Sequence, residues 1–391
     1  MNNKIDYLNG LRGISALVVV LFHYILAFYP ALTRGNPSMV HNPIELLIQS
    51  SPLNILYAGK FAVYVFFVLS GFVLSSHYFN NRDNNKLISS IIKRYFRLEI
   101  PIFFTILLSY ILMKLGLYFN QQTYPITLST DSLNRLWNFE PSFLGMLKES
   151  LLTVFTLNKS DYVPSLWTME IELYGSFMVF TILLFFGRYR FRFLIYLLLI
   201  YYLWNNYYVL FIFGLLLSDL VNGGKNYLLN ITNRTLSYII LILGLYLGSF
   251  TFVNIENSVY KILNISALVP SYYHIGSVLV VLAVLISPDL QVTLSKKIPL
   301  FLGRISFSLY LLHLLVMGSF SCFLFLLLKD SFSYNITAII MFIPSLVLII
   351  WLSYLMTIYI DEPSIKLSNK IGKTIQAKIY PIKNKSHSCN E

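Results

Sequence analysis

Ten apolar runs, separated by polar or proline-containing segments, dominate the pattern of the sequence. A membrane-spanning helix needs about 20 consecutive, mostly apolar residues. Most of the runs meet or approach that length, and only the fifth and sixth are clearly shorter, which favours tilted, re-entrant or buried helices there. The pattern predicts an all-α fold, a polytopic membrane helix bundle of about ten transmembrane helices. The runs cover residues 13–33, 59–79, 98–119, 165–187, 191–204, 207–222, 235–253, 272–288, 305–328 and 337–360.

Composition supports a membrane protein. The chain has 391 residues, of which 57% are hydrophobic and only 12% are charged, and its mean hydropathy is +0.67. These values lie far outside the usage of soluble proteins. Aromatic residues reach 16%, which suits belts at the two membrane interfaces. The two cysteines, Cys322 and Cys389, offer neither a disulfide framework nor metal-ligand spacing, so no metal is expected.

The positive charge of the chain is distributed unevenly. The formal net charge is +12. If the N-terminus is cytoplasmic, 21 of the 29 Lys and Arg residues fall on the cytoplasmic side of the predicted helices. Under the positive-inside rule this bias predicts that both termini are cytoplasmic, an N-in and C-in topology. The excess charge is therefore a topology signal, and no binding to nucleic acid is expected.

Two regions are predicted along the chain. Residues 1–360 form a transmembrane domain, and residues 361–391 form a short, basic, disordered cytoplasmic tail. The first apolar run has no small-residue cleavage site, so we expect the first helix to be retained. The outer segments 34–58 and 120–164 contain several prolines, which favour irregular loops, with a short interfacial helix around 143–155. These loops are candidates for a lid or an acceptor platform.

The first apolar run carries two ionisable residues, which are costly in lipid and therefore candidates for function. Arg12 and His23 are eleven residues apart, about three helical turns, so they share one face at a separation of about 16 Å. Arg12 would lie at the cytoplasmic mouth and His23 near mid-membrane. A histidine can accept a proton from a hydroxyl, and an arginine suits an anionic group. The alternative is a structural histidine with Arg12 as a topology anchor.

Two further segments have weaker signals. Ser70 and Gly71 in the second run are small, and either allow close helix packing or leave room for a ligand. Packing is the simpler interpretation. Arg94 and Arg97 lie three residues apart, on one face if helical, where a pair of arginines can bind phosphates. Such pairs are also ordinary anchors at a membrane edge.

The fourth run supplies a carboxylate. Glu172 would lie about 10 Å down a helix that enters from the outer side after Pro164, so it can approach His23 within the bilayer. A carboxylate there could orient the imidazole. Glu170 points to another face. His313 in the ninth run is a second intramembrane histidine, for which a structural role is favoured over a catalytic one.

Taken in this order, the segments resemble the acyltransferase-3 family, bacterial membrane acyltransferases typified by O-antigen and other polysaccharide O-acetylases. The resemblance covers almost the whole chain. It includes the family's Arg-x10-His pattern, its Ser-Gly-Phe segment and its Arg-x-x-Arg loop. The matching positions are Arg12 and His23, Phe66 to Phe72, Arg94 and Arg97, Trp167 to Glu172, Tyr310 to His313, and Glu362 with Pro363.

The resemblance implies that His23 is catalytic and that acyl-CoA enters near Arg94 and Arg97. The sequence departs from the family in two places. Residues 173–176 read Leu-Tyr-Gly-Ser where many members have Glu-Gln-Phe-Tyr. Many members also carry a C-terminal SGNH-type domain, whereas residues 361–391 here form a short basic segment after the tenth run, so we expect transfer to finish within the membrane domain.

The expected function is that of a membrane-bound O-acyltransferase in the bacterial inner (cytoplasmic) membrane, surrounded by membrane lipids. Acetyl-CoA is the expected donor, and a hydroxyl of a cell-surface glycan or its lipid-linked precursor is the expected acceptor. The catalytic candidates are His23, Glu172 and Arg12, the candidates for acyl-CoA binding are Arg94, Arg97, Ser70 and Gly71, and the structural or secondary candidates are Tyr310, His313 and Trp167.

Two alternatives fit the same residues, one from another class of protein and one with the same chemistry. A transporter or glycan exporter also places His, Arg and Glu along its path. Transporters commonly show two related halves and helices broken at matching positions, and neither is apparent in this sequence. An acyltransferase that modifies a lipid or a small molecule would keep the same chemistry with a different acceptor.

Overall fold

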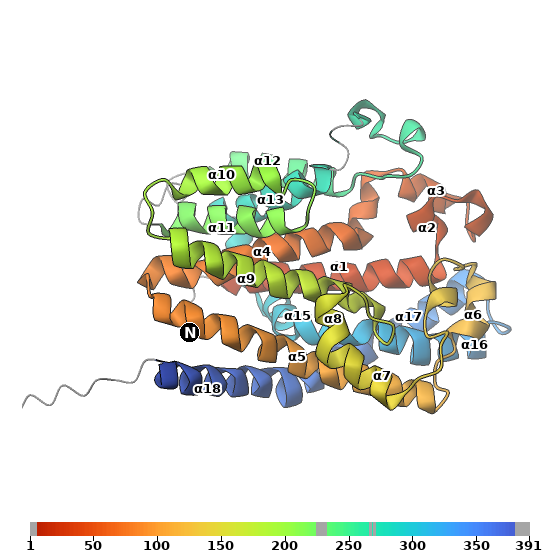
Figure 1. The fold of residues 1–391 in the computed structure, drawn as a ribbon. Helices are drawn as coiled ribbons and strands as arrows, with labels where there is room; N and C mark the ends of the chain where they lie inside the picture. Colours follow the sequence, from red (N-terminus) through yellow and green to blue (C-terminus); the bar gives the residue numbers. More distant parts are fainter. Residues whose placement is uncertain (1–5, 224–232, 266–267, 269–270, 380–391) are drawn as a thin grey trace, which may run out of the picture.

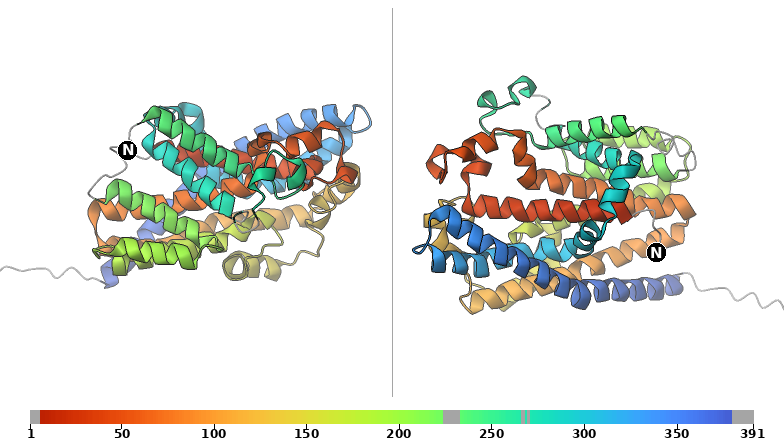
Figure 2. Two further views of the ribbon diagram at one scale, coloured as in Figure 1. Left: turned by 90° about the horizontal axis from the view of Figure 1, so that it is seen from above. Right: turned by 180° about the vertical axis from the view of Figure 1, so that it is seen from behind.

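The structure, a computed structural model, describes residues 6–223, 233–265, 268 and 271–379. Every regular element in this part of the chain is a helix. The long helices run side by side along roughly one direction, and several short helices gather at one end of the bundle (Figure 1 and Figure 2). The predicted all-α membrane bundle is confirmed for the described residues.

The helices differ widely in length and type. The α-helices are α1 (Asp6–Phe28), α2 (Ala31–Arg34), α3 (Ile44–Gln49), α4 (Gly59–Asn81), α5 (Asn84–Lys114), α6 (Asn120–Thr127), α7 (Phe143–Lys148), α8 (Val154–Thr156), α9 (Thr168–Phe186), α10 (Arg192–Tyr202), α11 (Tyr208–Asn222), α12 (Arg234–Gly248), α13 (Tyr272–Ile286), α14 (Pro288–Leu294), α15 (Lys297–Val316), α16 (Cys322–Leu328), α17 (Tyr334–Met356) and α18 (Glu362–Ile379). The 3₁₀-helices are η1 (Pro37–Met39), η2 (Pro52–Tyr57), η3 (Leu133–Arg135), η5 (Pro164–Trp167), η6 (Ile255–Asn257) and η7 (Lys261–Leu263), and the π-helical segments are η4 (Glu149–Thr153), η9 (Met317–Ser321) and η10 (Thr357–Asp361).

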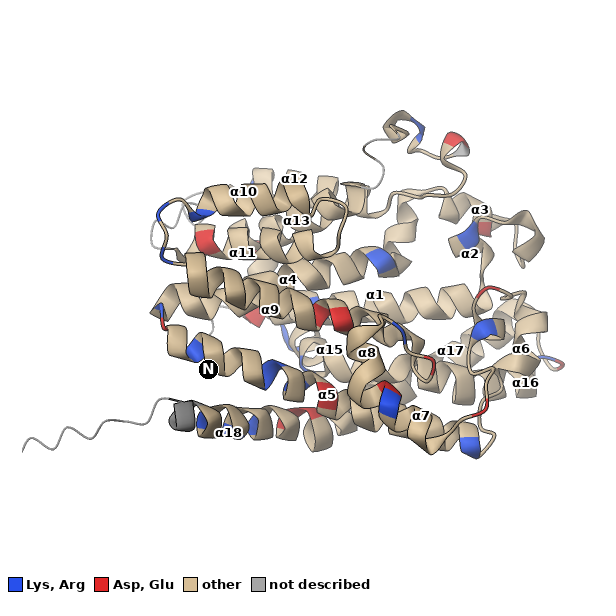
Figure 3. Cartoon of the chain, in the orientation of Figure 1, with Lys and Arg blue, Asp and Glu red and all other residues tan. Residues whose placement is uncertain are grey.

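Six helical segments of the described chain are long and apolar enough to cross a membrane. The pair α13 and α14, which bends by 96°, makes a seventh if it forms one span. Helices α10, α11 and α12 are apolar but shorter, as the sequence predicted for the first two. Each of the ten predicted apolar runs coincides with one of these helices, and most charged residues lie toward the helix ends (Figure 3). The total of ten spans and the orientation of the termini stay predictions.

Helix α5 begins earlier than the apolar pattern predicted. The predicted run starts at residue 98, but the helix starts at Asn84 because the side chain of Asp83 accepts hydrogen bonds from two backbone N–H groups of the first turn. Residues 84–97 are too polar to be recognised as part of a membrane-spanning run. Arg94 and Arg97 therefore lie in a helix, about one turn apart, instead of in a loop.

The C-terminal segment also differs from the predicted disordered tail. Helix α17 continues through η10 into α18, so residues Glu362–Ile379 are helical, and α18 lies along α5 (Figure 1). Its small residues Ser364, Ser368 and Gly372 recur every four residues and are buried. Small residues at this spacing let two helices approach closely. The rest of the predicted tail, residues 380–391, lies outside the described residues.

The outer segments contain short helices joined by polar contacts. Elements α7, η4 and α8 follow one another from Phe143 to Thr156, close to the predicted interfacial helix. The ring of His41 in the first outer segment lies with its Nε2 3.1 Å from the carbonyl oxygen of Thr127 in the second. The two outer segments are thus in contact with each other.

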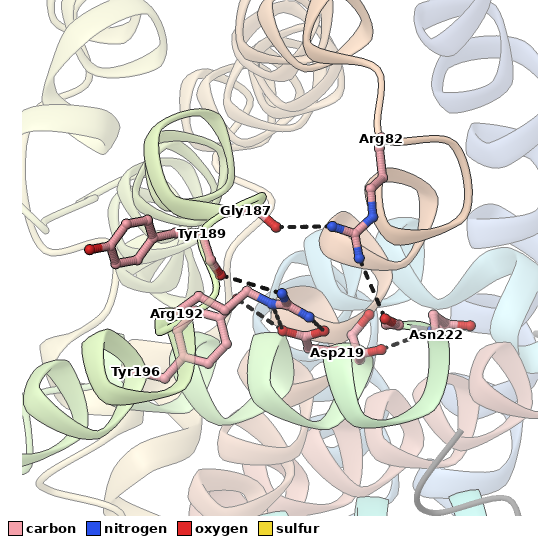
Figure 4. Close-up of polar contacts among 9 residues, drawn as sticks. Arg82, Gly187, Tyr189, Arg192, Tyr196, Asp219 and Asn222 are labelled. Carbon is pink, nitrogen blue, oxygen red and sulfur yellow. Dashed lines mark hydrogen bonds and ion pairs between the residues drawn. The ribbon is translucent and has the colours of Figure 1, made fainter. Parts of the chain in front are cut away.

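A polar cluster joins four helices (Figure 4), at the end of the bundle where α10 begins (Figure 1). Asp219 on α11 pairs with Arg192 at the start of α10, through contacts of 2.5 and 2.8 Å. Arg82, which ends α4, donates hydrogen bonds to the carbonyl oxygens of Gly187 after α9 and Gly223 after α11. Arginine groups with several donors can hold several helix ends at once. The cluster fixes the short helices α10 and α11 against α4 and α9.

Two glycines bring the backbones of α1 and α15 into contact. A β-carbon added to Gly13 would lie 2.3 Å from the backbone nitrogen of Gly303, and one added to Gly303 would lie 2.2 Å from the carbonyl oxygen of Asn9. Such close contacts are typical of small residues at membrane helix interfaces. His23 and His313 each follow the glycine of their own helix by ten residues, so these parallel helices carry both histidines to the same depth, about 15 Å further along.

Replacing Gly303 with valine should destabilise the protein. The new side chain would collide with backbone atoms of α1, which cannot rotate away, and overpacking of this kind costs about 1–3 kcal/mol. Thermal unfolding of the purified protein in detergent measures the effect. The control is Ile14→Val on the exposed side of α1, where the side chain is 40% exposed and no loss is expected. An unchanged unfolding temperature in Gly303→Val would contradict the backbone contact.

Candidate active site

A cavity of about 180 Å³ lies among α1, α4, α5, α9 and α15. Its lining includes charged residues of α5 and α9, two helices that carry charged positions within the bundle (Figure 3). Six of the ten predicted site residues line it, although they come from five different helices. The polar and sulfur-containing lining residues are Arg12, Ser70, Arg94, Arg97, Thr168, Met169, Glu172, Ser306, Tyr310 and Asp361.

A nearly buried ion pair forms one wall of this cavity. Arg94 on α5 pairs with Glu172 on α9, and the two side chains are only 10% and 14% exposed. The same carboxylate oxygen accepts a hydrogen bond of 2.8 Å from the hydroxyl of Ser70 on α4, and Nε of Arg94 donates one of 2.8 Å to Ser176. Ionised groups are tolerated in a membrane interior when they are paired in this way. The cluster therefore joins α4, α5 and α9 around a neutralised pair.

Arg12 and Arg97 line the same cavity but are unpaired. Within the described chain, neither guanidinium forms a hydrogen bond or an ion pair. Asp361 from η10 is the carboxylate that interacts electrostatically with Arg97. Three arginines thus face two carboxylates, those of Glu172 and Asp361, so the cavity keeps a net positive charge. Unpaired guanidinium groups in a partly closed cavity are suited to bind an anion such as a phosphate.

His23 and His313 face each other next to this cavity. Nε2 of His313 lies 3.1 Å from Nδ1 of His23, and the ring centroids are 4.7 Å apart. His313 is fully buried, whereas His23 is partly exposed. Neither ring belongs to the described lining of the cavity, but the ring of Tyr310, which does, lies 5.9 Å from that of His313. The histidine pair therefore lies about one helical turn beyond the end of the cavity.

Tyr310 connects α15 to the start of α9. Its hydroxyl donates a hydrogen bond to the carbonyl oxygen of Ser165 and lies 2.7 Å from the hydroxyl of Thr168. Trp167, in the same η5 turn, is placed differently, since its ring packs 5.6 Å from that of Tyr207 and does not appear in the described lining. Tyr310 thus holds one wall of the cavity.

Gly71 is a packing residue in this structure. A β-carbon at this position would lie 2.2 Å from the carbonyl oxygen of Phe211 on α11. The packing interpretation of the small pair therefore holds for Gly71, whereas Ser70 faces the cavity and Glu172.

The structure places Glu172 differently from the predicted contact with His23. The carboxylate binds Arg94 and Ser70, and the position beside the His23 ring is taken by His313. Counting residues along two helices gives depths, but not the direction in which each side chain points. The sequence did contain a signal for the histidine pair, since each of the two histidines follows a glycine by ten residues.

Comparison with known proteins identifies the class of enzyme. Residues 5–358 match the family described as an acyltransferase domain, which is nearly the whole chain. The chain therefore belongs to the acyltransferase-3 family and is a multi-pass membrane acyltransferase. The O-acetyltransferase PaAT-1 of Phomopsis amygdali is similar, with 24% identity over 80% of this chain and 72% of the relative. No solved structure matches the chain.

Removing one partner of the Arg94–Glu172 pair should destabilise the fold. Glu172→Ala leaves a nearly buried guanidinium without its counter-charge, and breaking a buried pair on one side costs about 3–5 kcal/mol. The double variant Arg94→Leu with Glu172→Ala removes both charges and should recover much of the loss. Thermal unfolding of the purified variants is the measurement.

The matched control for this prediction is Asp131→Ala, because the Arg135–Asp131 pair is well exposed, with side chains 72% and 43% exposed. Exposed pairs contribute little to stability, so this variant should unfold at the wild-type temperature. Equal stability of Glu172→Ala and the wild type would contradict the ion pair.

Proposed function

We propose that this acyltransferase moves an acetyl group from cytoplasmic acetyl-CoA to a hydroxyl of a cell-surface glycan or its lipid-linked precursor, in the bacterial cytoplasmic membrane. The proposal rests on one juxtaposition. A cavity with a net positive charge lies one helical turn from a pair of histidines, on helices held in register. A donor with anionic phosphates at one end and a thioester at the other fits such an arrangement.

The unpaired arginines are the proposed contacts for the donor. Coenzyme A carries phosphates, and Arg12 and Arg97 are the cavity guanidiniums without an ion pair in the described chain. Arg94 already binds Glu172, so we propose that Arg94 maintains the shape and the charge balance of the cavity wall. With the predicted topology, the positively charged cavity is entered from the cytoplasm.

His23 acts as the general base in the proposed reaction. It removes the proton of the acceptor hydroxyl while the oxygen attacks the thioester carbon. A carbon–oxygen bond forms, the carbon–sulfur bond breaks, and the departing thiolate takes the proton back from the imidazolium. The products are the acetyl ester and free CoA, and His23 returns to its neutral form.

The acceptor is proposed by chemistry and by analogy. The printed name of the Phomopsis amygdali relative, an O-acetyltransferase, supports acetyl as the group and a hydroxyl as its acceptor. Family membership decides against a transporter without chemistry. A lipid or small-molecule hydroxyl is the second candidate acceptor. The contacting outer segments 34–58 and 120–164 are the proposed platform for the acceptor.

Loss of the His23 imidazole should abolish transfer. Membranes containing the protein, supplied with acetyl-CoA and surface polysaccharide of the source cells, are assayed for free CoA and for acetyl ester. General acid–base catalysis contributes roughly 100-fold or more, so His23→Ala should lower kcat by at least that factor. His77→Ala, an exposed histidine on α4, is the matched control. Wild-type rates in His23→Ala at equal protein levels would contradict the assignment.

Loss of either unpaired arginine should weaken donor binding. A hydrogen bond to a charged group contributes about 1.5–3 kcal/mol, so Arg12→Gln and Arg97→Gln should each raise KM for acetyl-CoA by roughly 10-fold or more. Arg34→Gln, an exposed arginine at the far end of the bundle, should leave KM unchanged. If both cavity variants keep the wild-type KM, acetyl-CoA does not bind where we propose.

A further inference from the structure

We infer that His313 is a positioning residue, which together with the carbonyl of Val19 holds the proton on Nδ1 of His23 and leaves Nε2 of His23 as the nitrogen that removes the acceptor's proton. This inference rests on the proposed function, in which His23 is the general base. It assigns a specific role to His313, a residue for which the sequence favoured a structural role.

The backbone carbonyls near the pair determine where the protons lie. Nδ1 of His23 lies 2.9 Å from the carbonyl oxygen of Val19, and Nδ1 of His313 lies 3.2 Å from that of Leu309. A carbonyl oxygen can only accept a hydrogen bond. Each Nδ1 must therefore carry a proton to make its contact. A neutral imidazole has one N–H, so Nε2 of each ring is unprotonated.

The contact between the two rings agrees with this arrangement. Nε2 of His313, without a proton, can only accept, and it lies 3.1 Å from Nδ1 of His23, which can donate. The Nδ1 proton of His23 is thus shared between the carbonyl of Val19 and the ring of His313. Within the described chain, Nε2 of His23 has no hydrogen-bond partner, and the residue is partly exposed. Of the ring nitrogens in this histidine pair, Nε2 of His23 is therefore the one whose lone pair is available to accept a proton.

The arrangement has a clear use during transfer. When the acceptor hydroxyl gives its proton to Nε2, the His23 ring becomes an imidazolium, and its Nδ1–H donates more strongly to His313. The positive charge is then partly shared with His313, which is neutral and fully buried. As the carbon–sulfur bond breaks, the Nε2 proton passes to the thiolate and both rings return to the starting state. No proton is gained or lost by the pair.

The helices hold His313 firmly enough for such a role. The contact of Gly13 with Gly303 fixes α15 against α1 ten residues before the pair. Tyr310, one turn before His313, donates a hydrogen bond to the carbonyl of Ser165 in η5, which precedes α9. His313 is thus anchored from two sides, and its ring orientation follows from the fold.

Two substitutions of His313 separate positioning from packing. In His313→Gln the side-chain carbonyl oxygen can accept the Nδ1–H of His23, whereas His313→Leu fills space without an acceptor. We expect His313→Leu to lower kcat for acetyl transfer at least tenfold with little change in KM for acetyl-CoA, and His313→Gln to keep most of the wild-type kcat. The matched pair His77→Leu and His77→Gln, on the exposed face of α4, should equal the wild type. A wild-type kcat in His313→Leu, or equal losses in both His313 variants, would overturn the inference.

A second measurement does not depend on activity. In protein labelled with ¹⁵N-histidine, the His23 signal is the one lost in His23→Gln, and its nitrogen shifts report which nitrogen carries the proton. We expect a protonated Nδ1 in the wild type, and a smaller fraction of protonated Nδ1 in His313→Leu, where the carbonyl of Val19 is the remaining acceptor. A protonated Nε2 on neutral His23 would overturn the inference even if transfer occurs. A protonated Nδ1 in a wild-type enzyme that transfers no acetyl group would support the role of His313 and contradict the proposed function.

Discussion

The backbone contact between α1 and α15 is the constraint on which the rest of the site depends. In lipid, apolar helices have no hydrophobic driving force to associate, so membrane helices are held together by close packing and by polar contacts. Gly13 and Gly303 allow the two backbones to touch, and ten residues later the imidazoles of His23 and His313 meet. A slip of one residue would move one helix by about 1.5 Å and turn it by about 100°, which would separate the rings. The same two helices carry Arg12 and Tyr310 to the cavity, so a single contact fixes both parts of the site.

The charges around the cavity fall into two groups with different consequences. Arg94 and Glu172 neutralise each other between α5 and α9, so they hold the wall whether or not a ligand is bound. Arg12 and Arg97 form no ion pair in the described chain, and Asp361 balances only one of their two charges. An uncompensated charge near the membrane interior is unfavourable, and a bound anion relieves that cost. The wall is therefore stable by itself, whereas the arginines beside it are more stable with an anionic ligand.

The sequence predicted the helical runs and six of the residues that line the cavity, but not the contacts between helices. Apolar length located the helices because lipid requires it. Apolar length missed the start of α5, where the Asp83 cap begins the helix in a polar segment. It also missed α18, which is mostly polar and packs against α5 through the small residue Gly372. Residue spacing placed Arg12 and His23 on one face, but the direction of Glu172 depends on how α9 is rotated, which spacing within one helix cannot give. The positions of the small residues, where helices can approach closely, indicate how each helix is rotated.

The π-helical segment η10 has a consequence for the length of the chain. A π turn amounts to one extra residue within an α-helix, and each residue turns the helix by about 100°. Before η10, α17 has many exposed apolar side chains, and beyond it α18 places Gly372 against α5, with Asp361 facing the cavity between them. Loss of one residue from Thr357–Asp361 would rotate all of α18 and remove its small residues from α5. In this part of the protein, insertions and deletions are therefore far more damaging than substitutions at the exposed lysines of α18.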